Sequence, residues 1–339
     1  RAGCKLFFGY PITPSSEVPE YYARVMRERP EEGVTFIQAE TEVSAFNMVA
    51  GAVATGHRAM TATSGPGFSL GQEAMSYMAA ADLPAVIVEI MRAGPADGEI
   101  LAAQGDYFQA TKGGGHGDYH LIVYAPNSVQ EIVSLTADAF NKSEEYRVPA
   151  MILGDGTLGQ MMEPVDFDSV PDPITSNKDW ATTGTKNERE HNIINSLYLS
   201  PDKLEATILE RQERYNIIME KEQRFEAHDI EDADIVVTAY GTTSRVVETA
   251  VKTVRAEGLK VGVIRPITLW PFPEKIFKEA AKTAKAFLSV EMSMGQMVED
   301  VKLAVDGKAP VHFFGRTGGI IPTPIEIADE IRKIAGGLR

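Results

Sequence analysis

The chain has 339 residues, 44% of them hydrophobic, so it is long enough for two domains and for a sizeable buried core. Its net charge of −15 argues against nucleic-acid binding and against an anionic membrane surface, and we expect neither a transmembrane helix nor a signal peptide. The single cysteine, Cys4, excludes an internal disulfide and an iron–sulfur cluster held by this chain alone, and it fits a cytoplasmic location.

Short apolar runs alternate with helix-length segments over about the first 160 residues. We expect strands at Lys5–Tyr10, Val34–Gln38, Ala59–Thr63, Ala85–Met91, Leu121–Ala125 and Ala150–Gly154. We expect helices at Ser16–Arg29, Val43–Ala54, Phe68–Ala80 and Val129–Tyr146. Continuous apolar strands separated by helices predict an α/β domain with a parallel sheet covered on both faces.

The alternation stops between residues 161 and 230. The stretch "EPVDFDSVPDPITSNKDW" is rich in Pro, Asp and Ser and is typical of a connector. The segment from Pro201 to Asp229 is predicted to form one long, mostly solvated charged helix with Pro201 in its first turn. An apolar stripe would dock this helix on a domain through Leu204, Ile208, Tyr215 and Ile218.

A second α/β unit is predicted over residues 231–339. Its expected strands are Asp234–Tyr240, Lys260–Ile264, Ala286–Val290 and Val311–Phe314. Its expected helices are Thr243–Glu257, Pro273–Lys282, Gln296–Asp306 and Pro324–Ala335. The whole chain is therefore interpreted as two α/β domains joined by a connector and a long helix.

Polar residues follow successive strands of the first domain. In chain order they are Thr13, Ser15, Ser16, Glu40, Glu42, the turn "SGPG" at Ser64–Gly67, and Arg92. Because open parallel sheets bind ligands at the carboxyl ends of their strands, this convergence predicts a ligand site. The turn is neither a Walker A nor a GxGxxG sequence, but its glycines leave bare backbone at a helix N-terminus.

Each of these residues also has a purely structural explanation. Thr13 to Ser16 suit a helix cap, "SGPG" suits a simple strand-to-helix turn, and Arg92 suits a structural ion pair. Glu42 in a first helical turn interacts favourably with the helix dipole. If the helix begins near Thr41, Glu42 is held rigidly on it and Glu40 is left on the turn.

Several motifs identify a family. The segments "GYPITPSSEVPEYY", "AETEVSAFNMVAGA", "TATSGPGFSL", "MRAGP" and "GGGHGDYHLIVYAPNSVQE" resemble, in this order, the α chain of the 2-oxoacid:ferredoxin oxidoreductases. The resemblance continues through "AYGTTSR", "GVIRPITLWPFP", "EMSMGQMVEDVK" and "FFGRTGGIIPTP" and covers essentially the whole chain. The last four segments look most like the 2-oxoisovalerate (branched-chain) type.

This resemblance implies a fold and an activity. Residues 1–160 would form a pyrimidine-binding domain for thiamine diphosphate, and residues 231–339 would resemble the transketolase C-terminal domain. The implied reaction is oxidative decarboxylation of a 2-oxoacid with coenzyme A, which yields acyl-CoA and passes electrons to ferredoxin. The resemblance places Mg²⁺, the cofactor's diphosphate and a cluster with a β subunit, and it implies γ and ferredoxin-like δ subunits. The chain alone would be inactive.

The resemblance also assigns residues. Glu42 would bind N1′ of the aminopyrimidine ring and favour its imino tautomer, because Glu42 and Gly51 match the family's spacing and Glu40 does not. Thr13 and Arg92 would contact the 2-oxoacid. Residues that would face the cofactor are Pro11, Ile12, Ser64 and Gly65. His116 and Asp118 lie in a glycine-rich segment that would shape the site or a subunit interface.

No metal ligand is assigned to this chain. The sequence "GDG" at Gly154–Gly156 matches the start of the thiamine diphosphate metal motif, but Asn177 comes too early to complete it. We interpret "GDG" as a strand end and turn. Two alternative substrates stay open, 2-oxoglutarate and pyruvate. Two alternative classes of protein also stay open, a non-oxidative thiamine enzyme component and a non-catalytic structural subunit.

Overall fold

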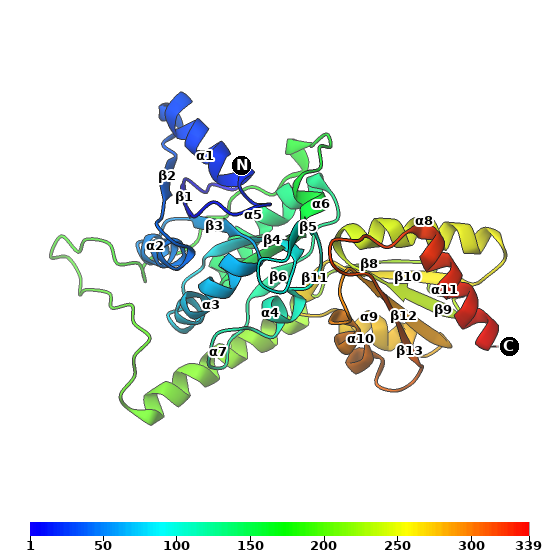
Figure 1. Ribbon diagram of the computed structural model, residues 1–339. Coiled ribbons are helices and arrows are strands. Elements are labelled where there is room, and N and C mark those ends of the chain that lie inside the picture. The colour runs from blue at the N-terminus through cyan, green and yellow to red at the C-terminus, as the bar shows by residue number, and fades with distance from the viewer. Residues whose placement is uncertain (339) are drawn as a thin grey trace.

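The computed structural model describes residues 1–338 and has two α/β units, each with a sheet between layers of helices (Figure 1). The first sheet has eight strands, seven of them in the order β11-β6-β7-β4-β3-β1-β2, with β5 paired to β4. These strands are β1 (Leu6–Gly9), β2 (Thr35–Gln38), β3 (Ala59–Thr63), β4 (Val86–Ala93), β5 (Glu99–Ala102), β6 (Ile122–Tyr124), β7 (Ala150–Asp155) and β11 (Thr268–Trp270). All pairings along the order are parallel except that of β11 with β6. The prediction of a parallel sheet is confirmed.

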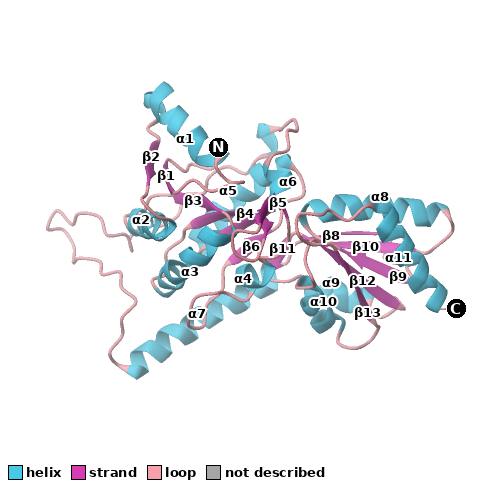
Figure 2. Cartoon of the chain, in the orientation of Figure 1, coloured by secondary structure: helices cyan, strands magenta, loops and turns pink. Residues whose placement is uncertain are grey.

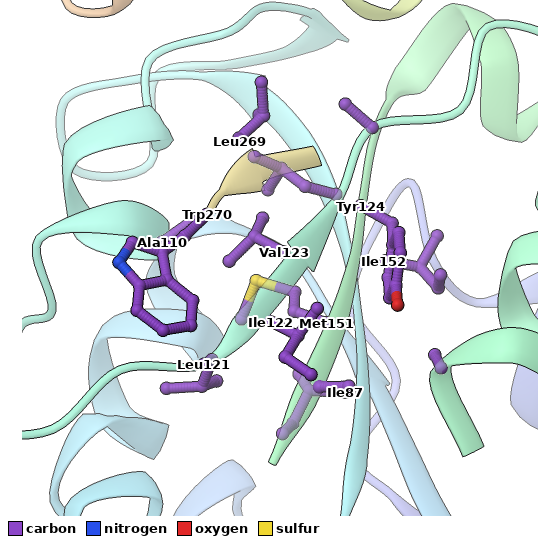
Figure 3. Packing of buried hydrophobic residues seen from close by; sticks show 14 of the residues in the cluster. Ile87, Ala110, Leu121, Ile122, Val123, Tyr124, Met151, Ile152, Leu269 and Trp270 are labelled. Atoms are coloured by element: carbon purple, nitrogen blue, oxygen red, sulfur yellow. The ribbon is translucent and has the colours of Figure 1, made fainter. Parts of the chain in front are cut away.

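Helices cover both faces of the first sheet because its central strands are apolar on both sides. They are α1 (Glu17–Glu28), α2 (Glu42–Ala54), α3 (Gly65–Ala80), α4 (Tyr107–Thr111), α5 (Val129–Tyr146), α6 (Gly156–Gly159) and α7 (Pro201–Lys221), with short 3₁₀ turns at Pro30–Glu32 and Phe167–Ser169. Every residue of β3, β6 and β7 is buried. Figure 3 shows this packing around Ile122, Val123, Met151 and Ile152. Continuous apolar strands of this kind require cover on both faces.

The second sheet has five strands in the order β13-β12-β9-β10-β8. They are β8 (Phe225–His228), β9 (Ile235–Thr238), β10 (Val261–Pro266), β12 (Ala286–Glu291) and β13 (Val311–Gly315). The helices of this unit are α8 (Gly241–Ala256), α9 (Glu274–Ala280), α10 (Met297–Val305) and α11 (Pro324–Gly337). Side chains of α8 and α11 share one apolar cluster, and those of α9 and α10 belong to the other, so the two pairs cover opposite faces.

The long charged helix is shorter than predicted. It was expected to run to Asp229, but α7 ends at Lys221, and β8 pairs antiparallel with β10. The reason is tertiary: β10 offers an unpaired edge, and pairing with it satisfies backbone groups that a frayed helix end would leave to water. Within the predicted stripe Tyr215 and Ile218 are buried, Ile208 is half-buried and Leu204 is 40% exposed. Arg211, which was not expected inside, is buried as well.

An extended loop precedes α7. After the turn at Phe167–Ser169 it first runs along the first unit, where Val170 and Ala181 are buried and the Thr182 N–H donates to the Ala54 carbonyl at 2.9 Å. It then forms the long light-green excursion in Figure 1 that leads to α7 and is drawn as loop in Figure 2. This agrees with the predicted connector. The "GDG" stretch is a strand end and turn, as predicted, since β7 ends at Asp155 and its carboxylate accepts hydrogen bonds from the backbone N–H groups of Thr157 and Leu158 at 3.1 and 3.2 Å.

Polar contacts join the two units. Arg265 of β10 is 2% exposed and donates two hydrogen bonds to the Glu131 carboxylate of α5, at 2.8 and 2.6 Å, and one to Glu226 at 2.9 Å. Gln104 is fully buried, and its side chain donates to the Tyr240 carbonyl at 2.9 Å and accepts from Thr243 Oγ1 at 3.0 Å. In such folds ligands bind at the carboxyl ends of the strands. In the first sheet this edge therefore lies against the second unit.

Within residues 1–338, no helix has both the length and the apolar composition needed to cross a membrane.

Candidate functional site

The residues after β1 and β4 meet at one edge of the first sheet. Pro11, Ile12 and Thr13 form a turn in which Ser15 Oγ donates to the Ile12 carbonyl at 2.9 Å. Arg92, near the end of β4, donates from Nη1 to the Thr13 carbonyl at 3.0 Å. The structure therefore brings Thr13 and Arg92 together, although they lie far apart in the sequence.

Glu42 is the first residue of α2. Thr41 caps this helix, because its Oγ1 accepts a hydrogen bond from the Ser44 backbone N–H at 3.2 Å. The Glu42 side chain points inward and is 9% exposed, whereas Glu40 is exposed and accepts a hydrogen bond from Ser44 Oγ at 3.4 Å. The helix start thus separates the two acids, and only Glu42 is held in a fixed, water-poor place.

The glycines of "SGPG" allow α3 to approach Glu42. α3 begins at Gly65 with Ser64 as its N-cap residue. A Cβ atom on Gly67 would lie 2.7 Å from Glu42 Cγ and 2.8 Å from its Oε1, and it would also collide with Thr63 Oγ1. The Glu42 carboxylate therefore lies directly against the backbone of the first turn of α3.

Gly67→Ala is expected to lower the free energy of unfolding by about 1–3 kcal/mol, because the added methyl group overpacks this contact. Gly336→Ala is the matched control, since no atom lies within 4 Å of the added Cβ and alanine favours a helix. Denaturant midpoints of the two variants and the wild type measure the difference. Equal effects of the two substitutions would show that the contact at Gly67 is not tight.

Several buried polar atoms around this turn have no hydrogen-bond partner within residues 1–338. They are Thr63 Oγ1, Ser64 Oγ, both carboxylate oxygens of Glu89, Arg92 Nε and Asp106 Oδ2. Buried polar groups are nearly always paired, so such a concentration of unpaired atoms indicates that their partners come from outside the chain. Together with the close Glu42–Gly67 contact, this fits a polar ring bound at the start of α3.

A cavity of about 750 Å³ lies next to these groups. The first unit contributes the start of α3, Arg92 with the turn that follows it, and Asp106. The second unit contributes the segment Met292–Met294, with Gln296 and Thr317. Apolar side chains of Leu70, Met292 and Met294 form part of the wall, and Arg92 is the one Lys or Arg among the described residues that line it.

Glu89 and Asp106 were missed by the sequence analysis. Glu89 is fully buried in the middle of β4, and Asp106 is half-buried beside the cavity. Burial raises the pKa of Glu89 well above its ordinary value, and the nearby Asp106 raises it further. Burial also raises the pKa of Asp106, to about 6. The signal in the sequence was an acid inside the otherwise apolar run "AVIVEIM".

His116 and Asp118 lie elsewhere. Both are exposed, and His116 Nδ1 lies 3.5 Å from Ser76 Oγ, toward the opposite end of α3. At 1.5 Å of rise per residue, Ser76 is roughly 18 Å along the helix from Ser64. The structure therefore does not bring His116 or Asp118 to the strand-end cluster.

The comparisons with known proteins agree with this fold. Residues 1–232 match the family "Pyruvate flavodoxin/ferredoxin oxidoreductase, thiamine diP-bdg", and residues 233–327 match "Pyruvate:ferredoxin oxidoreductase core domain II". The chain is 50% identical over 335 residues to ketoisovalerate oxidoreductase subunit VorB of Methanothermobacter marburgensis, covering 99% of this chain and 94% of the relative. It is 38% identical to 2-oxoglutarate synthase subunit KorA of the same organism, over 97% of this chain and 94% of the relative.

Solved structures give the same result. A 2-oxoglutarate:ferredoxin oxidoreductase from Magnetococcus marinus matches 98% of this chain with a TM-score of 0.86 and 28% identity, and this chain covers 62% of that longer one. A split-gene transketolase matches at a TM-score of 0.59 and 15% identity, which reflects the shared fold alone. The chain thus belongs to the pyruvate flavodoxin/ferredoxin oxidoreductase family. It is a subunit of an oxidoreductase of the 2-oxoacid:ferredoxin type.

Proposed function

We propose that this chain is the α subunit of an enzyme that oxidatively decarboxylates branched-chain 2-oxoacids, with coenzyme A as co-substrate and ferredoxin as electron acceptor. The observation that carries the proposal is Glu42, an acid buried at the start of α2 against the bare backbone at Gly67. A catalytic carboxyl needs such a fixed, water-poor position.

The residues present fit thiamine diphosphate. When bound, the cofactor supplies a carbanion that attacks the keto carbon of a 2-oxoacid. Glu42 would hold a proton at N1′ of the aminopyrimidine ring. The unpaired hydroxyl of Thr63 lies with the Glu42 side chain against Gly67, and the unpaired hydroxyl of Ser64 lies at the start of α3. Pro11, Ile12 and Gly65 would complete the wall of this site.

Arg92 and Thr13 would bind the 2-oxoacid. Arg92 already uses Nη1 on the Thr13 carbonyl, which fixes the guanidinium and leaves its other nitrogens for a carboxylate. The apolar side chains of Leu70, Met292 and Met294 suit a branched aliphatic chain. A second carboxylate, as in 2-oxoglutarate, would meet no further Lys or Arg among the described lining residues. The 50% identity to a ketoisovalerate oxidoreductase subunit, against 38% to a 2-oxoglutarate synthase subunit, supports the same choice.

Arg92→Ala is expected to raise KM for the 2-oxoacid about 10²-fold, because one partner of a charged hydrogen bond is removed. Arg92→Lys is expected to fall between this variant and the wild type, since an ammonium cannot form the bidentate contact. Steady-state kinetics of the complete complex measure both. An unchanged KM in both variants would mean that Arg92 serves only the Thr13 carbonyl.

Partner subunits complete the proposed enzyme. Mg²⁺, the diphosphate and an iron–sulfur cluster would be held by a β subunit, and γ and ferredoxin-like δ subunits would carry electrons onward to ferredoxin. Large exposed apolar side chains on α2 and α3, Val43, Met48 and Tyr77, support a partner on this side. The chain alone would then be inactive.

The test uses the complex purified with its native partners. Viologen reduction with coenzyme A is measured on 2-oxoisovalerate, 2-oxoglutarate, pyruvate and an aromatic 2-oxoacid. The proposal predicts the highest kcat/KM for 2-oxoisovalerate. A preference for 2-oxoglutarate or pyruvate would overturn the substrate. Inactivity on all four with intact clusters would favour a non-oxidative thiamine enzyme component or a structural subunit.

A further inference from the structure

Two acids lie behind the proposed substrate site. Glu89 sits on the central strand β4, in register with Thr63 of β3 and Leu153 of β7, and its side chain is fully buried. Asp106, which directly precedes α4, lines the cavity between the two units. The two carboxyl groups lie within hydrogen-bonding reach of each other. Glu89 is thus reached from the cavity through Asp106.

The pair is satisfied only if it holds a proton. As carboxylates both groups are acceptors, and among residues 1–338 no side chain donates to either oxygen of Glu89 or to Asp106 Oδ2, which leaves the Gly65 backbone N–H as the donor that acts on Glu89. Two charged carboxylates in contact, away from water, repel each other strongly, so one proton is retained between them.

Few charges face this pair. Arg92, from the same strand as Glu89, is the cation that acts on both acids. Tyr240 approaches Asp106 from the second unit, and α3 presents the Gly65 backbone N–H but no titratable side chain. Glu42 lies against Gly67, further along α3. With one proton on the pair, its single negative charge balances the guanidinium of Arg92.

We propose that Glu89 and Asp106 share one proton when Arg92 holds no ligand, and that they take up a second proton from solvent when the carboxylate of a 2-oxoacid binds Arg92. The inference rests on the proposed function, in which Arg92 binds that carboxylate. Glu89 and Asp106 are then positioning residues that keep the charge around Arg92 balanced. The 2-oxoacid brings one negative charge to Arg92, and the second proton removes one negative charge from the carboxyl pair.

The sign of the pH dependence follows from linkage. The ligand-bound state holds more protons than the free state, so affinity for the anion falls as pH rises. Since the pKa of Asp106 is raised to about 6, the free pair is already doubly protonated below that pH and no uptake occurs there. Above it, KM is expected to rise by up to about tenfold per pH unit, the limit for one proton.

Calorimetry of the complete complex tests the proposal. The probe is 2-hydroxyisovalerate, which carries the carboxylate but lacks the keto carbon, titrated at pH 5 and pH 7 in buffers of different ionisation enthalpy. We expect no proton uptake at pH 5 and an uptake that approaches one proton at pH 7. Absence of uptake at pH 7 in the wild type would overturn the inference without recourse to any variant.

The two variants should differ in a way that simple loss of structure cannot produce. In Glu89→Gln the amide replaces the protonated carboxyl of Glu89, so Asp106 can still take up a proton and we expect proton uptake and a pH-dependent KM close to those of the wild type. In Asp106→Asn the buried Glu89 stays protonated, so we expect a low KM that does not change between pH 6 and pH 8. Exposed Glu99 of β5, mutated to Gln, is the control and should keep the wild-type profile.

Arg92→Ala separates the two proposals. If this variant binds the probe as tightly as the wild type, the assignment of Arg92 in the proposed function fails. If it loses binding while Asp106→Asn retains wild-type proton uptake at pH 7, only the role of the carboxyl pair fails.

Discussion

Glu42→Gln is expected to lower kcat by roughly 10²–10⁴-fold in a complex that still assembles and still binds thiamine diphosphate. Glutamine has nearly the same shape, so the packing against Gly67 is kept. It cannot hold the proton that the proposed role requires. Viologen reduction measures the loss, and exchange of the C2 proton of the bound cofactor, followed by NMR, measures the same step without electron transfer.

Glu40→Gln is the matched control for this prediction. Glu40 lies on the turn before α2, is exposed and contacts Ser44. We expect its replacement to leave kcat and C2 exchange close to wild-type values. Full activity of Glu42→Gln would mean that Glu42 serves only to stabilise the start of α2 through the helix dipole.

Arg265→Met is expected to lower the free energy of unfolding by about 3 kcal/mol, the lower end for a buried ion pair that loses one partner. Arg265 is almost fully buried and bridges the two units through Glu131 and Glu226. Methionine fills much of the volume but leaves the Glu131 carboxylate without its bidentate partner. Glu131 is the more buried acid, so it carries most of the loss.

The control for Arg265 is Arg332→Met. Arg332 also makes a bidentate contact, with Glu257 at 3.0 and 2.6 Å, but both side chains are about 40% exposed. An exposed pair of this kind contributes little, so we expect a much smaller loss of stability than in Arg265→Met. Urea midpoints of the two variants, followed by circular dichroism, give the comparison. Similar losses in the two variants would show that burial does not decide the strength of the Arg265 contacts.

The sheets were predictable from the sequence to different degrees. Strands such as β3 and β7 are continuous apolar runs, and their burial on both faces follows directly from that composition. β8 and β11 are short edge strands whose stability comes from partners far away in the chain, β10 and β6. Local patterns carry no information about such partners, which is why "RFEAHD" was assigned to a helix.

The candidate site shows the same division. Thr13, Glu42 and Arg92 follow predicted strands, so their place at one sheet edge could be expected from topology. Glu89 and Asp106 could not, because one lies inside a strand and the other in a loop. Only the fold shows that the two acids lie together and that no side chain within residues 1–338 donates to Glu89.

Strand β11 bears on how this chain can be divided. Thr268–Trp270 belongs by sequence to the second family segment, yet it pairs with β6 at the edge of the first sheet, where Leu269 and Trp270 join Val123 and Ala110 in the core (Figure 3). A chimaera joined between residues 232 and 233 would therefore build that sheet from two parents. Recombination at the family boundary should succeed only when the donor's β11 matches the recipient's β6, so the two segments are constrained to evolve as one unit.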